Sequence, residues 1–209
     1  MITIRPAKTR EEFDEACRLV EKVYVNHGYC EFLREDEFAS AVLIAVDEGR
    51  IVGTVGLWPA ENGKLPVEHY FGFDCEEVCP FKRTEMMEIC KMASIESENG
   101  LISTALIVSI CEYSWNDESL EIAFASSKPD LIHLLEKRLS IPVHCVEKDV
   151  DENNVKGVFG QYFLDDPRPL PIYFIVKEAD QYLPRLHRML KNSVSFELDG
   201  FDHRKPVAF

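Results

Sequence analysis

The chain has 209 residues, 46% of them hydrophobic, which suits one domain with a sizeable core. Its net charge of −14 argues against binding to nucleic acid or to an anionic membrane surface. No run of about 18 apolar residues occurs, and the N-terminus lacks the basic and apolar regions of a signal peptide. We therefore expect a single cytoplasmic domain over residues 1–209.

Apolar runs separated by turn signals predict strands and helices along the whole chain. Thr9 followed by Glu12 is the pattern of a helix N-cap, and apolar residues at helical spacing come next. The turn 47–50 joins two apolar runs and predicts a hairpin, because its glycine supplies a positive φ. Ser127, followed by Pro129, predicts the start of a later helix. The predicted strands are Ile2–Arg5, Ala41–Val46, Ile51–Trp58, Glu68–Asp74, Glu85–Ala93, Leu120–Ala125, Val143–Val146, Pro171–Val176 and Ser193–Leu198, and the predicted helices are Glu11–Val25, Leu101–Tyr113, 127–139 and Glu178–Lys191.

The order of these elements predicts an α/β (α+β) fold. Strands outnumber helices and the first pairings are hairpin-like, so we expect a mixed central sheet with helices on both faces. No glycine-rich phosphate loop of the dinucleotide or P-loop kind follows a strand. This argues against a doubly wound nucleotide-binding fold.

The segment Glu85–Ala93 carries the strongest functional signal. Glu88 and Lys91 stand in an otherwise apolar strand, where a carboxylate resists ionisation and its pKa rises toward neutrality. Such a group can take a proton from an amine nucleophile near pH 7. A simpler interpretation, a buried Glu88–Lys91 pair or a charge on an edge strand, stays open.

The seven cysteines are mostly scattered among apolar neighbours, as expected for small buried hydrophobes. Cys75 and Cys79 alone are closely spaced, with His69 upstream and Cys90 downstream. Zinc sites favour a tight pair that is repeated elsewhere, so we expect no metal. His144 lies in an apolar strand, where a structural role is the simpler interpretation.

A series of short segments runs through roughly the first hundred residues: Val23-Tyr24-Val25 followed by Gly28-Tyr29, then Val52-Gly53-Thr54, Gly63-Lys64-Leu65-Pro66 and Glu88-Ile89-Cys90-Lys91-Met92-Ala93. Their order and spacing resemble the GNAT acyltransferase superfamily. Within it, the chain is similar to the acyl-homoserine-lactone synthases and the long-chain N-acyl amino acid synthases. The second half matches by the order of its elements.

The resemblance implies a three-layer sandwich with a splayed pair of central strands, between which the phosphopantetheine arm of an acyl donor lies like an added strand. It implies that Glu88 helps to deprotonate the acceptor amine and that Asp36 lies in the loop shaping the acceptor pocket. Lys91 would orient Glu88 or meet an anionic group. Tyr24 would protonate the leaving thiolate, although a core tyrosine with one satisfied hydroxyl is the simpler interpretation.

The donor would be held by backbone groups of Met92 and Ala93 and by the loop that ends in Asn99 and Gly100. Ordinary coenzyme-A-using GNAT enzymes carry a glycine-rich loop there, at a helix N-terminus that cradles the pyrophosphate. The loop 94–100 has one glycine and two glutamates instead, which would repel a pyrophosphate. This favours a carrier-protein donor, for which Arg185, Arg188, Lys191, Lys82 and Arg83 are candidate docking cations.

Three positions depart from the family pattern. Val20 and Gly56 stand where the relatives carry arginine, and Lys91 replaces a third arginine, keeping the charge without the bidentate fork. Two hypotheses follow. The first is an N-acyltransferase that uses an acyl-CoA or acyl-carrier-protein thioester as co-substrate, holds no permanent cofactor and acylates a small amine such as an amino acid. The second is a degenerate, non-catalytic GNAT-fold domain that binds a ligand or a protein.

Overall fold

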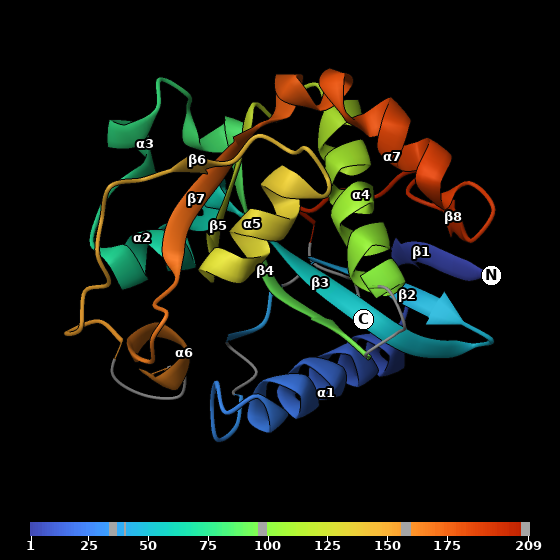
Figure 1. Ribbon diagram of the computed structural model, residues 1–209, viewed down its shortest axis with the longest axis horizontal. Helices are drawn as coiled ribbons and strands as arrows, with labels where there is room; N and C mark the ends of the chain where they lie inside the picture. The colour runs from blue at the N-terminus through green and yellow to red at the C-terminus, as the bar shows by residue number, and fades with distance from the viewer. Residues whose placement is uncertain (34–36, 40, 96–99, 156–159, 206–209) are drawn as a thin grey trace.

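A computed structural model describes residues 1–33, 37–39, 41–95, 100–155 and 160–205 (Figure 1). These residues form an eight-stranded sheet in the order β6-β7-β5-β4-β3-β2-β1-β8. Its strands are β1 Ile2–Pro6, β2 Ala41–Asp47, β3 Arg50–Pro59, β4 Met86–Ser94, β5 Ile122–Ser127, β6 His144–Cys145, β7 Leu170–Ile175 and β8 Val194–Phe196. The β4–β5 and β1–β8 pairs are parallel and the others antiparallel, so the predicted mixed sheet is confirmed.

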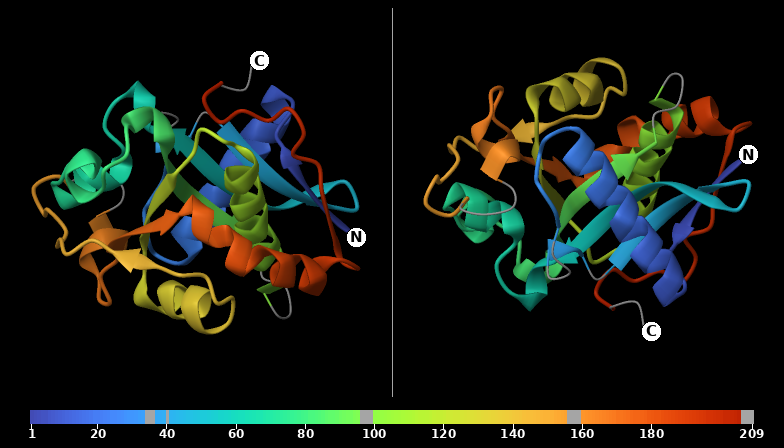
Figure 2. Two further views of the ribbon diagram at one scale, coloured as in Figure 1. Left: turned by 90° about the horizontal axis from the view of Figure 1, so that it is seen from above. Right: turned by 90° about the horizontal axis from the view of Figure 1, so that it is seen from below.

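Helices cover both faces of this sheet, as predicted (Figure 2). One face carries α1 Arg10–Asn26, α2 Pro66–Phe71, α3 Cys75–Val78 and α6 Gly160–Leu164; the other carries α4 Leu101–Asn116, α5 Pro129–Lys137 and α7 Leu183–Leu190. Short 3₁₀ helices are η2 Ala60–Asn62, η3 Arg83–Glu85 and η5 Val176–Gln181. The nearly all-apolar α4 packs deep against the sheet and anchors the largest core cluster.

Local signals explain where several elements begin and turn. The Thr9 side chain accepts a hydrogen bond from the N–H of Glu12, which caps α1 as predicted. Glu48 and Gly49 both have positive φ, 48° and 78°, so the β2–β3 hairpin turns over two left-handed residues. Val194 pairs with Ile2 at the sheet edge, which confirms the edge strand predicted near the C-terminus.

The prediction of a strand over Glu68–Asp74 is wrong, because α2 occupies its first half. Pro66 begins this helix and Gly72, with φ of 62°, ends it in the left-handed conformation. Ser127 is also not a helix cap: it is the last residue of β5, paired with Leu170, and Lys128 is the N-cap of α5.

Two further differences concern the second half. The helix predicted over Glu178–Lys191 is divided at Tyr182 into η5 and α7. Helix α6 was not predicted at all, and it supplies Tyr162 and Phe163 to the packing against α2. A five-residue helix is too short to show a periodic pattern.

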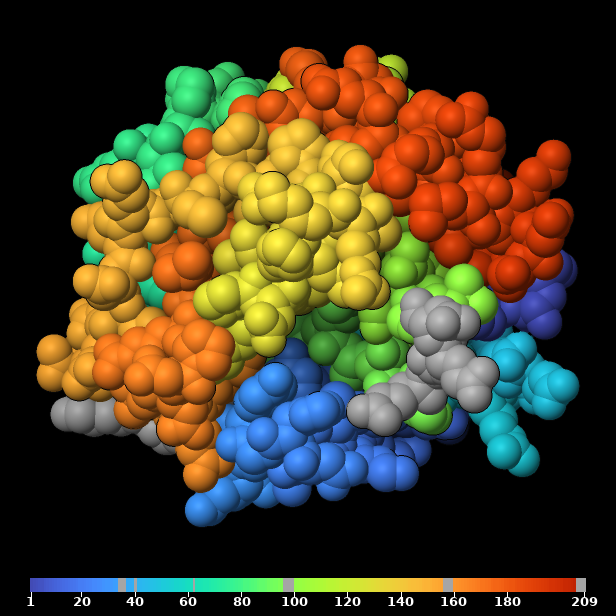
Figure 3. All heavy atoms as spheres, viewed as in Figure 1, coloured from blue at the N-terminus to red at the C-terminus, as the bar shows by residue number. Residues whose placement is uncertain are grey.

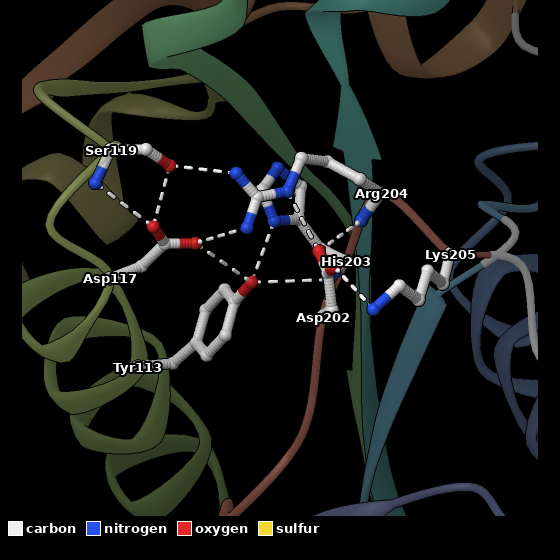
Figure 4. Close-up of polar contacts among 7 residues, drawn as sticks. All are labelled: Tyr113, Asp117, Ser119, Asp202, His203, Arg204 and Lys205. Carbon is white, nitrogen blue, oxygen red and sulfur yellow. Dashed lines mark hydrogen bonds and ion pairs between the residues drawn. The ribbon is translucent and has the colours of Figure 1, made fainter.

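Residues 202–205 are fixed to the end of α4 by a polar network (Figure 4). The Tyr113 hydroxyl lies 2.6 Å from Nδ1 of His203, which is 1% exposed. Burial lowers the pKa of His203 to about 4, so the ring is neutral near pH 7 and Nδ1 can accept this hydrogen bond. Arg204 adds contacts to Asp117 at 3.1 Å and to Asp202 at 2.7 Å. The network thereby holds this segment against the end of α4, whose apolar residues belong to the largest core cluster.

Candidate active site

The central strands β4 and β5 separate in the middle of the sheet. Their described pairs run only from Met86 with Ile122 to Glu88 with Phe124. The edge of β4 from Ile89 to Ser94 is thus left unpaired by β5 along its described length, and it lines a cavity. Lys91, with φ of 51°, lies where the pairing of β4 with β3 changes register, as at a β-bulge. The splayed central strands implied by the resemblance are present.

The cavity between these strands has a volume of about 460 Å³, and its lining residues can be divided into two chemically different groups by the helices they lie near. In Figure 3 a recess opens between α1 in blue, α5 in yellow and α4 in light green. We call the lobe on the α1 and α6 side the ring lobe; its lining includes Tyr24, His27, Tyr29, Tyr70, Tyr162, Phe163 and Lys128. We call the lobe on the α4 and α5 side the aliphatic lobe; its lining includes Ile107, Ile110, Cys111, Leu131, Leu135, Ile141, Phe174, Val176, Ala179 and Tyr182.

Glu88 lines the cavity at the end of the paired part of β4 and is 2% exposed. Its Oε2 accepts a hydrogen bond of 2.8 Å from the N–H of Val67, in the first turn of α2. Burial raises the pKa of Glu88 to about 8, against the opposing effects of the Val67 hydrogen bond and of the Lys91 charge. The raised pKa expected from the apolar strand is therefore present, and the carboxyl can exchange a proton near neutrality.

A second buried carboxylate, Glu68, fixes the helix that holds Glu88. Its oxygens accept hydrogen bonds from the N–H groups of Leu65 at 2.6 Å and Cys75 at 2.8 Å. Arg83 binds both oxygens, at 2.7 and 2.6 Å. Burial would raise the pKa of Glu68, but the Arg83 guanidinium and the two N–H groups outweigh it and hold the pKa below its usual value.

This pair was not predicted from the sequence. A signal for it exists, because Leu65 precedes the proline that begins α2, and Glu68 stands three residues after Leu65, where capping carboxylates occur. The sequence analysis names Arg83 as a candidate docking cation. In the structure its guanidinium also donates to the carbonyl oxygens of Ala60 and Gly63, so its hydrogen bonds are made within the fold.

The structure brings most of the other predicted site residues to the same cavity. Tyr24, Lys91, Met92 and Ala93 all line it. Burial raises the pKa of Tyr24 well above its usual value, so its hydroxyl stays protonated and can serve as a donor. Gly100, the N-cap of α4, is not among the lining residues. The predicted residues Asp36 and Asn99 lie outside the described residues.

The structure gives a physical reason for two of the departures from the family pattern. A Cβ at Gly56 would lie 2.9 Å from the Cβ of Ala39 and 3.2 Å from Sγ of Cys90, so no arginine fits there without displacing its neighbours. Val20 is 2% exposed in α1 and packs in the core. Both positions at which the resemblance implies an arginine are therefore enclosed by neighbouring residues in this chain.

Of the ring lobe, the contributions of Tyr29, Tyr162 and Lys128 were not predicted from the sequence. Tyr29 and Tyr162 meet edge to face at 5.1 Å between ring centroids, and Lys128 lies 5.0 Å over the Tyr162 ring. Helix α6 brings Tyr162 to Tyr29 from a distant part of the chain, and because this helix was not predicted, the contact was not predicted either.

Within the described part of the chain, no group of three or more histidine, cysteine or acidic side chains is placed to hold a metal ion. His144 instead bonds Glu178 at 3.0 Å.

Comparison with known proteins supports the fold reached from this geometry. A family model described as thermostable hemolysin matches residues 7–173. No curated protein matches the chain. A coenzyme-A-dependent acyl-homoserine lactone synthase, BjaI, is similar over 97% of this chain and 95% of its own, with a TM-score of 0.69 and 13% identity. FeeM, an N-acyl amino acid synthase from uncultured soil microbes, is similar over 87% and 94%, with a TM-score of 0.61 and 17% identity.

The synthase LasI is similar over 86% of this chain and 93% of its own, with a TM-score of 0.56 and 13% identity. At these identities the likeness concerns the fold. The resemblance to the GNAT superfamily, and within it to the acyl-homoserine-lactone synthases and the N-acyl amino acid synthases, is confirmed at that level.

Proposed function

The chain belongs to the thermostable hemolysin family, and from its divided sheet and cavity we propose that it is an N-acyltransferase. It would move an acyl group from a phosphopantetheine thioester to a small amine such as an amino acid. The observation that carries this proposal is Glu88, a buried carboxyl with a pKa of about 8 that faces the cavity between β4 and β5. Of the proteins that share the fold, BjaI is described as an acyl-homoserine lactone synthase and FeeM as an N-acyl amino acid synthase, which supports acyl transfer.

In this reaction the amine nitrogen attacks the thioester carbonyl carbon, the C–N bond forms and the C–S bond breaks. Glu88 accepts the proton that the nitrogen loses. Tyr24, which is protonated near pH 7 because burial raises its pKa, donates a proton to the departing thiolate. The unpaired edge of β4 offers backbone groups to the pantetheine, and those at Met92 and Ala93 polarise the carbonyl. Solvent exchange restores the protonation of both side chains.

The chemistry of the two lobes supports one place for the acyl chain and another for the amine. The described lining of the aliphatic lobe carries no charged side chain, which suits a hydrocarbon chain. The ring lobe presents the cations Lys91 and Lys128, and Glu88 is the one carboxyl among the described lining residues. A polyamine acceptor would meet like charges there. An amine that also carries a carboxylate, as an amino acid does, is the better match.

The alternative, a non-catalytic module, predicts a gap filled by side chains. Small residues instead face the aliphatic lobe from β5, namely Ala123 and Ala125. The cavity of about 460 Å³ is within the range of small-molecule sites. The open gap thus favours the enzyme.

The test is a panel of acyl-CoA and acyl-carrier-protein thioesters offered with each of the common amino acids, with free thiol release and product mass as readouts. We expect thiol release that depends on the amine, together with a product heavier than the amine by one acyl group. The donor class that supports turnover separates coenzyme A from carrier protein. Binding of thioesters without amine-dependent thiol release from any pair would favour the non-catalytic module.

The family name suggests a further prediction about membrane lysis. No helix among the described residues is long and apolar enough to cross a membrane. An N-acyl amino acid, by contrast, is an amphiphile whose chain gains about 0.8 kcal/mol per buried methylene in a bilayer. We therefore expect any lysis of erythrocytes by cells making this chain to reside in the small-molecule product. It should survive boiling and protease treatment of the extract and should disappear with Glu88→Gln. Lysis by the purified protein without thioester would contradict this.

A further inference from the structure

We propose that the contact between Cys111 and Tyr182 closes the aliphatic lobe and sets the upper length of the acyl chain that the enzyme accepts. Cys111 belongs to α4, and Tyr182 stands at the junction of η5 and α7. Both line the cavity, and the Tyr182 hydroxyl lies 3.8 Å from Sγ of Cys111. This inference rests on the proposed acyl transfer.

The end of the lobe is shut off from solvent. Tyr182 is 5% exposed, Ala179 2% and Ile141 1%, although all three line the cavity. Behind Tyr182, the buried Leu183 and Leu186 of α7 belong to the core cluster built on α4. Because these residues are buried, we infer that the lobe is closed at Tyr182 and that a chain entering the lobe stops at this ring.

The hydroxyl of Tyr182 is an unusual group for the bottom of an aliphatic lobe. The thiol of Cys111 is its hydrogen-bond partner within the described part of the chain, and sulfur is a weak acceptor. Burying a hydroxyl with so little compensation costs free energy, and a phenylalanine would pack as well. The polar tip is consistent with a specificity role, since it places an unfavourable surface against the end of an overlong chain.

The path along α4 indicates the length that fits. Ser103, in the first turn of α4, lines the cavity, and its hydroxyl is 2.8 Å from that of Ser94 at the end of β4. Cys111 is eight residues further along the helix, which corresponds to roughly 12 Å. Part of this path belongs to the pantetheine arm. A hexadecanoyl chain, of the length found in membrane lipids, spans about 15 Å, half of the bilayer hydrocarbon core, and is longer than this path. An acetyl group would leave most of the path empty. We therefore expect a donor with a chain longer than acetyl and shorter than hexadecanoyl.

The test compares acetyl, octanoyl and hexadecanoyl donors on the wild-type enzyme and on two variants that move the end of the lobe. Tyr182→Leu removes the ring and should raise the ratio of kcat/KM for hexadecanoyl over octanoyl at least 10-fold. Cys111→Leu fills the end and should lower the ratio of kcat/KM for octanoyl over acetyl at least 10-fold, since one misplaced methylene changes rates about 10- to 200-fold. Cys145→Leu, exposed and outside the cavity lining, is the matched control and should leave both ratios unchanged.

The rise in unfolding temperature caused by each acyl-CoA is measured in parallel, because binding stabilises the native state without requiring turnover. Binding that stops at the same chain length, without transfer to any amine, would refute the proposed function and leave the length limit in place. A wild-type preference that keeps rising to hexadecanoyl would refute the length limit and leave the acyltransferase. Variants that change all three donors equally would also refute it, because a purely structural effect has no length dependence.

Discussion

Replacement of Glu88 by glutamine should lower kcat between about 10²- and 10⁴-fold, the range that a positioned general base contributes. The amide keeps the shape of the carboxyl and its carbonyl oxygen can still accept the Val67 hydrogen bond, but it cannot take a proton. In the wild-type enzyme the carboxylate is the active form, so kcat should rise with pH and level off above the pKa of about 8. The variant should lose this rise. The check is kcat against pH for both proteins with the best thioester.

The same variant should be more stable than the wild type at alkaline pH. The pKa of Glu88 rises from its usual 4.5 to about 8 in the native state, so above pH 4.5 the unfolded chain releases a proton that the native chain retains. Stability due to this group is complete below pH 4.5 and falls as pH rises through 8, by on the order of 5 kcal/mol as an upper bound. Denaturant unfolding at pH 5 and pH 9 measures the difference. A glutamine variant that unfolds more easily at pH 9 than the wild type would contradict the assignment.

Replacement of Arg83 by methionine should destabilise the protein by about 3–5 kcal/mol, because it leaves a buried carboxylate without its counter-charge. The Glu68 side chain is 0% exposed, whereas the Arg83 side chain that pairs with it is 23% exposed. Because Glu68 anchors α2, which donates the Val67 hydrogen bond to Glu88, kcat should fall as well. Chemical denaturation with kcat measured on the folded fraction tests both effects.

Two variants serve as controls for this prediction. Arg168→Met breaks an exposed pair with Glu152 and should cost less than about 1 kcal/mol. The double variant Arg83→Met with Glu68→Leu removes both charges and should recover part of the lost stability. A double variant that is less stable than Arg83→Met alone would show that Glu68 acts mainly through its N–H partners.

The strands, the long helices and the mixed sheet could be predicted because each rests on local patterns. The hairpin turn at Glu48 and Gly49 and the Thr9 cap are decided within four residues of sequence. The strand predicted over Glu68–Asp74 failed because Pro66 and Gly72 mark a helix too short for a periodic signal. Local chemistry was sufficient where an element was long or sharply capped.

In the candidate site, too, the residues that local sequence identifies could be predicted, and the contacts between distant segments could not. Glu88 and its raised pKa could be predicted, since an acid in an apolar strand is visible in the sequence. The Glu68–Arg83 pair and the meeting of Tyr29 with Tyr162 join segments that lie far apart in the chain. Such contacts depend on the tertiary arrangement. The closed position at Gly56 depends on it too, because the obstruction comes from Ala39 and Cys90.

The parallel pairing of β1 with β8 has a consequence for how the chain is made. Ile2 leaves the ribosome before its partner, Val194, which is added 192 residues later. At about 5–20 residues per second, roughly 10–40 s pass between them. During that time the outer edge of β1 offers unpaired N–H and C=O groups to any other strand nearby. The nascent chain is therefore most exposed to edge-to-edge aggregation before β8 is made, and slower translation would lengthen that interval.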